Sequence, residues 1–184
     1  MPKLKSKAFI TYWVPVIIWV SVIATESISP FAASDHTSRI VIPVLHWLMP
    51  HLDFRHLTEI HEVLRKVGHF IGYGLLSYFL FRALRGTHHV YRGTENLLSR
   101  AYLRKRTPLA GDYWKASWTL LAVLGTSFVA TCDELHQMTL KNRGGSWRDV
   151  LLDTIGGLIF QLVIFVLISM RARVRRHASE RVEV

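Results

Sequence analysis

The sequence predicts an all-α membrane protein: a polytopic bundle of four transmembrane helices, with an interfacial segment between the first and the second. Half of its 184 residues are hydrophobic, and long apolar runs alternate with polar stretches. The chain also has a net charge of +10, and its basic residues lie between and after the apolar runs. That arrangement indicates loops that face anionic lipid, so we expect membrane lipids as partners and no nucleic acid.

The length fits a single domain over residues 1–184, with a membrane core at about residues 8–170 and a basic tail at 171–184. The sole cysteine, Cys132, excludes an internal disulfide and any cysteine-rich metal site. Basic residues precede the first apolar run, but no clean small-residue cleavage site follows it. We therefore interpret that run as a membrane helix and not as a cleaved signal peptide.

The first predicted crossing runs from Ala8 to Thr25, which is about long enough to span a bilayer. The next segment, residues 31–58, is of mixed character. Within it, residues 40–52 are apolar but too few to cross, and they contain two prolines. An interfacial or re-entrant segment fits this pattern better than a crossing does.

The second crossing is predicted within one continuous helix from Leu57 to Leu84. Gly68 and Gly72 are four residues apart, which predicts a small-residue face that allows close contact with another helix. His69 and Tyr73 are also four residues apart and therefore share a face. Two such polar side chains inside an apolar helix are candidates for a functional site.

A basic polar loop is predicted at residues 85–115. The third crossing follows at residues 114–132, the fourth lies at 150–170, and the basic tail begins at Arg171. With both termini inside, 16 of the 23 Lys and Arg residues fall on the cytoplasmic side and seven fall outside. The positive-inside rule thus predicts a multi-pass protein of the cytoplasmic (inner) cell membrane, with both termini in the cytoplasm.

This orientation places a polar stretch, residues 133–149, on the outer side. Asp133 and Glu134 fit one helical turn that continues the third crossing, and Gln137 lies within reach of both acids. Ser146 is the predicted N-cap of the fourth helix, with Asp149 as an acidic variant of the capping box.

Asp153 is predicted to lie one turn inside the fourth crossing and shares a helix face with Asp149. A buried, unpaired carboxylate is costly, so Asp153 should be protonated or paired with a cation. The candidate partners are His69, Arg143 and Lys66, which all fall near the outer end of the bundle. Gly156 and Gly157 follow and predict close helix contact.

Three motif blocks occur in order along the chain: Lys66-Val-Gly-His69-Phe-Ile-Gly-Tyr73, then Asp133-Glu134-Leu-His136-Gln137, then Arg143-Gly-Gly-Ser-Trp-Arg-Asp149-Val-Leu-Leu-Asp153-Thr-Ile-Gly156. The ordered set resembles the VanZ-like family of bacterial membrane proteins, over most of residues 8–170. The chain departs from that pattern at Asp153, where Asn is frequent. The resemblance implies a role in the cell envelope and a link to low-level resistance to glycopeptide antibiotics such as teicoplanin.

Two functions are compatible with these residues. The first is an outward-facing site that binds a lipid-linked or cell-wall-related ligand through six side chains: Lys66, Tyr73, Gln137, Arg143, Asp149 and Asp153. The alternative is an intramembrane acid/base enzyme acting on an envelope lipid or precursor. Its candidate catalytic residues are His69 as general base, with Asp133 or Glu134 as the orienting carboxylate or the acid.

Three further readings of the polar cluster remain. One is a transporter or channel, since intramembrane acids also carry protons. An interhelical salt-bridge network would only fix how the helices pack. A metal site at His69, Asp133, Glu134 and His136 lacks the HExxH or HxxxH spacing, so no metal and no other cofactor is expected. The sequence is compatible with an oligomer and does not decide whether the protein is an enzyme.

Overall fold

A computed structural model describes residues 2–27, 34–95, 114–139 and 145–180 of the chain. In these residues it forms five helices: α1 (Pro2–Ser27), α2 (Ser34–Leu48), α3 (Phe54–Glu95), α6 (Ala116–Met138) and α7 (Trp147–Glu180). Four of them contain candidate membrane spans, namely Phe9–Ser27, Phe54–His88, Ala116–Met138 and Trp147–Arg175. These observations confirm the predicted all-α bundle of four apolar spans.

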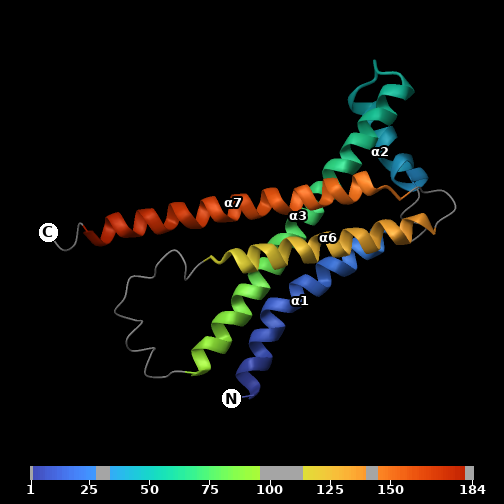
Figure 1. The fold of residues 1–184 in the computed structure, drawn as a ribbon. Helices are drawn as coiled ribbons and strands as arrows, with labels where there is room; N and C mark the ends of the chain where they lie inside the picture. Colours follow the sequence, from blue (N-terminus) through green and yellow to red (C-terminus); the bar gives the residue numbers. More distant parts are fainter. Residues whose placement is uncertain (1, 28–33, 96–113, 140–144, 181–184) are drawn as a thin grey trace.

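The long helix α3 runs through the middle of the bundle and contacts each of the other four helices (Figure 1). The start of α7 lies at one end of the bundle. The start of α1 and the end of α7 lie at the opposite end (Figure 1). We call the end that contains the start of α7 the α6–α7 end, and the opposite one the terminal end. α1 bends along its length (Figure 1), and Pro15 inside it removes one helical hydrogen bond.

Helical structure extends further than the sequence predicted at several boundaries. α3 continues to Glu95, so the first part of the predicted basic loop is helical. α7 continues to Glu180, and most of the predicted basic tail therefore prolongs the fourth helix. The segment between α1 and α3 contains the short helix α2, with Pro43 inside it. Its apolar part, residues 38–48, is too short to be a span, as predicted.

Large apolar side chains point outward along all four spans, for example Ile17, Phe128 and Leu162, which are all exposed. The interior contains buried polar side chains beside a hydrophobic core. Gln161 on α7 is buried and donates from its Nε2 to the carbonyl oxygen and the Oγ of Ser77 on α3, at 2.9 Å each. This distribution suits an apolar solvent, in which polar groups must find partners between helices.

The glycines on the helix faces differ in whether a neighbouring helix packs against them. A Cβ added to Gly156 would lie 2.5 Å from the carbonyl oxygen of Phe70, so α7 contacts the α3 backbone there, as predicted. A Cβ added to Gly68 or Gly72 would meet no atom within 4 Å. The predicted close helix contact at Gly68 and Gly72 is therefore wrong, because these glycines border an open space.

Candidate functional site

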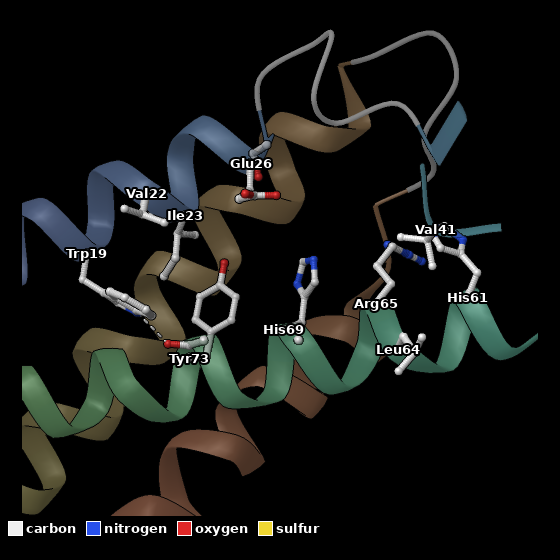
Figure 2. Close-up of a pocket in the computed structure, with 13 residues that line it drawn as sticks. Trp19, Val22, Ile23, Glu26, Val41, His61, Leu64, Arg65, His69 and Tyr73 are labelled. Atoms are coloured by element: carbon white, nitrogen blue, oxygen red, sulfur yellow. Dashed lines mark hydrogen bonds between the residues drawn. The ribbon is translucent and has the colours of Figure 1, made fainter. Parts of the chain in front are cut away.

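The open space beside Gly68 and Gly72 is a cavity of about 410 Å³ between α1, α2 and α3. We call it the α1–α3 cavity. Five apolar side chains from these helices line it: Trp19, Val22, Ile23, Val41 and Leu64. Figure 2 shows them around the same space as the polar residues of α3.

Four polar side chains of α3 line this cavity at regular four-residue intervals: His61, Arg65, His69 and Tyr73 (Figure 2). Residues four apart on a helix lie on one face, so this row follows from helical geometry alone. His61 and Tyr73 are buried, and the Arg65 guanidinium donates a hydrogen bond to the Glu62 carboxylate at 3.0 Å. The sequence predicted His69 and Tyr73 as site residues. His61 and Arg65 were not predicted, although they lie eight and four residues before His69 on the same helix face.

Trp19, near the middle of the candidate span of α1, lines one end of the cavity. Its indole Nε1 donates to the carbonyl oxygen of Gly72 at 2.8 Å. A dashed line at Trp19 marks this bond in Figure 2. The ring therefore lies across α3 and forms an aromatic wall next to Tyr73.

The carboxylate of Asp153, on the neighbouring helix α7, lies next to the His69 ring. The ring Nδ1 lies 3.7 Å from Oδ2 of Asp153, whose side chain is 1% exposed, whereas the His69 side chain is 25% exposed. Neither oxygen of Asp153 accepts a hydrogen bond from the described residues, and the buried hydroxyl of Tyr73 has no partner among them either. Of the two predicted partners of Asp153 that lie in the described residues, His69 and Lys66, His69 lies within ion-pair distance.

A much smaller pocket, of about 10 Å³, lies on the α7 side of His69. Lys66 and Asp149 line it, together with Asp153 and Arg65. These two predicted ligand-binding residues are therefore separate from the α1–α3 cavity. His69 lines both spaces.

Asp133 is engaged by hydrogen bonds within the bundle. The hydroxyl of Ser27, at the end of α1, donates to Oδ1, and Nε2 of Gln137 donates to Oδ2 at 2.9 Å. All three side chains are buried. Together they tie the end of α1 to α6 at the α6–α7 end.

Glu134 links α6 to the start of α7. Its Oε2 accepts the backbone N–H of Ser146 at 2.8 Å, and Ser146 Oγ in turn accepts the N–H of Arg148 at 3.2 Å. Ser146 is thus the N-cap of α7, as predicted. The capping-box partner is Glu134 and not the predicted Asp149, because the chain folds Gly145 directly against α6, where a Cβ would lie 2.3 Å from the Glu134 carbonyl oxygen.

One predicted residue, Arg143, lies outside the described residues. The predicted metal alternative at His69, Asp133, Glu134 and His136 finds no support in the described parts of the chain, where no three His, Cys, Asp or Glu side chains lie close enough to hold an ion.

Comparison with known families adds one decisive observation. A family model described as VanZ/LLP1 matches residues 12–169, which includes every helix around the α1–α3 cavity. The chain belongs to the VanZ/LLP1 family. No curated protein and no solved structure matches it. This member of the VanZ/LLP1 family is a multi-pass membrane protein with four candidate spans in its described residues.

Proposed function

We propose that this VanZ/LLP1 protein binds an envelope ligand that is lipid-linked or related to the cell wall, with its lipid portion in the α1–α3 cavity on the outer side of the membrane. The observation that carries the proposal is the cavity itself. Its volume of about 410 Å³ falls within the range of about 300–1,000 Å³ that is usual for small-molecule sites.

The cavity has an apolar part and a polar part, which suits an amphipathic ligand. The apolar walls from α1 and α2, such as Val22 and Val41, match an acyl or isoprenoid chain. The row on α3 brings a guanidinium, Arg65, between two imidazoles, His61 and His69. Arginine and histidine donors suit a phosphate or carboxylate headgroup, so we expect the ligand to be anionic.

The outer placement of this cavity rests on the charge count. Lys and Arg concentrate in the segments at the terminal end, and the α1–α3 cavity lies toward the α6–α7 end. An outward-facing ligand site is consistent with a role in envelope resistance to glycopeptides, which the family resemblance implies. The resistance role is part of the proposal.

The test is a binding measurement with a short-chain polyprenyl phosphate as the probe, on the full chain in detergent by native mass spectrometry. Arg65→Gln should weaken binding by about tenfold, because it removes one charge-assisted phosphate contact. Arg55→Gln is the matched control, because Arg55 lies on the same helix and outside the cavity. Equal binding by all three proteins would contradict the proposal.

A second candidate function is acid/base catalysis on the bound ligand, favoured by the His69–Asp153 relationship. A buried carboxylate behind a partly exposed imidazole can orient the ring and stabilise its protonated form while the ring transfers a proton. Asp133 and Glu134, which have hydrogen-bond partners in the bundle, are less suited to this role than Asp153. His69→Gln separates the two functions: an enzyme loses turnover while still binding the probe, and a binding protein has no turnover to lose.

A further inference from the structure

A second cavity of about 410 Å³ lies toward the terminal end of the bundle, between α1, α3 and α7. Three arginines line it: Arg82 and Arg85 from α3, and Arg171 from α7. The described residues that line this cavity include no Asp or Glu. We call it the arginine cavity. It shares no lining residue with the α1–α3 cavity.

One wall of the arginine cavity is held in place by close packing. The ring of Tyr12 lies directly on Gly86, where a Cβ would be 2.5 Å from a ring carbon. The Arg82 guanidinium lies 5.4 Å from the centre of that ring and donates to the carbonyl oxygen of Thr11 at 3.4 Å. This cation–π contact orients the arginine and leaves its charge intact.

The floor of the cavity is apolar. Ile164, Leu167 and Ile168 of α7 form it, and Leu167 is half exposed at the surface of the span. The candidate spans of α3 and α7 end at His88 and Arg175, only a few residues beyond the three arginines. The guanidinium groups therefore lie near the depth at which lipid headgroups meet lipid chains.

The guanidinium groups of Arg82 and Arg171 make the lining of this cavity positive, which favours an anion there. A phosphate group suits the site best, because guanidinium groups donate to phosphate oxygens in parallel pairs. Basic pockets between membrane helices are a recurrent site for anionic lipid headgroups. Here the apolar floor reaches the lipid-facing surface of α7, which a free phosphate would not use.

We propose that the arginine cavity binds the phosphate headgroup of an anionic phospholipid, with the lipid chains along the exposed surface of α7 next to Leu167. This inference is independent of the ligand proposed for the α1–α3 cavity. It also holds whichever leaflet contains the terminal end.

The test uses the full chain in a neutral detergent and native mass spectrometry with two lipids of identical chains, phosphatidylglycerol and phosphatidylcholine. The wild-type chain should retain more phosphatidylglycerol than phosphatidylcholine. Arg171→Gln should weaken that binding by about tenfold, since one charge-assisted contact is lost. Arg173→Gln is the matched control, because Arg173 is an exposed arginine on the same helix that does not line the cavity.

Arg171 is the deciding position because it is exposed, so its replacement should not disturb the fold. Arg82→Gln should weaken lipid binding too, but it also removes the contact with Tyr12. The inference is overturned by equal retention of the two lipids or by equal losses in Arg171→Gln and Arg173→Gln. A loss confined to Arg65→Gln would assign the preference to the α1–α3 cavity. If glycerol 1-phosphate displaced phosphatidylglycerol from the protein as effectively as added phosphatidylglycerol does, the cavity would be a site for free phosphate instead.

Discussion

His69 of α3 and Asp153 of α7 form a pair in which Nδ1 lies 3.7 Å from Oδ2; the carboxylate is almost fully shielded and the imidazole is partly exposed. The location of this pair between the two most extensively packed helices makes it part of both the fold and the proposed site. His69→Ala would leave the buried Asp153 carboxyl group without the imidazole beside it, which should lower the free energy of unfolding by about 1–3 kcal/mol.

The double variant His69→Ala/Asp153→Asn tests whether the two residues interact. It should recover part of the loss, with a coupling free energy of about 1–3 kcal/mol, because residues in contact are not additive. The measurement is unfolding by SDS in mixed micelles, followed by circular dichroism. Strictly additive losses would mean that the two side chains do not act as a pair.

The glycines of α3 and α7 should respond in opposite ways to alanine. Gly68→Ala and Gly72→Ala add a methyl group to open space, so helix propensity alone should raise the free energy of unfolding by about 0.5–1 kcal/mol. Gly156→Ala should instead destabilise the bundle, because its Cβ would lie 2.5 Å from the Phe70 carbonyl oxygen. The same unfolding assay compares all three variants, and a stable Gly156→Ala protein would contradict the close packing of α3 and α7.

Filling the α1–α3 cavity should remove ligand binding without unfolding the protein. Gly68→Leu projects a large side chain into the cavity from a position where an added Cβ meets no atom. Binding of the polyprenyl phosphate should fall in the order wild type, Gly68→Ala, Gly68→Leu, while the helical circular dichroism signal stays constant. Unchanged binding in the leucine variant would place the ligand outside this cavity.

Glu134 should behave as a cap and not as a catalytic acid. Glu134→Ala leaves the Ser146 N–H without its acceptor, which should cost about 1–3 kcal/mol of stability. Glu134→Gln retains an oxygen acceptor and should cost less, with ligand binding close to that of the wild type. Loss of envelope function in a stable, ligand-binding Glu134→Gln protein would favour the catalytic role instead.

The four-crossing arrangement predicts opposite sides for the two ends of α6. Reporter fusions after Lys115 and after Thr139, which flank the helix, should report the cytoplasmic and the outer side respectively. Fusions that report the same side would show that α6 does not cross the membrane.

The sequence by itself determined the number and order of the membrane helices. Length and hydropathy act within each segment, so the four spans follow from local composition, and so does the N-cap at Ser146. Local periodicity also placed His69 and Tyr73 on one face of α3. The continuation of α3 and α7 beyond the apolar runs was missed, because basic helical turns resemble solvated loops when hydropathy is the criterion.

Only the tertiary structure decided which polar groups meet. The hydrogen bonds from Ser27 to Asp133 and from Ser146 to Glu134, and the approach of His69 to Asp153, depend on the rotation and offset of one helix against another. The same is true of the glycines: Gly68-xxx-Gly72 is the pattern of a packed face, yet α1 and α2 stand away from it and leave a cavity. A sequence motif predicts which face of a helix has small side chains. The positions of the neighbouring helices determine whether another helix packs against that face.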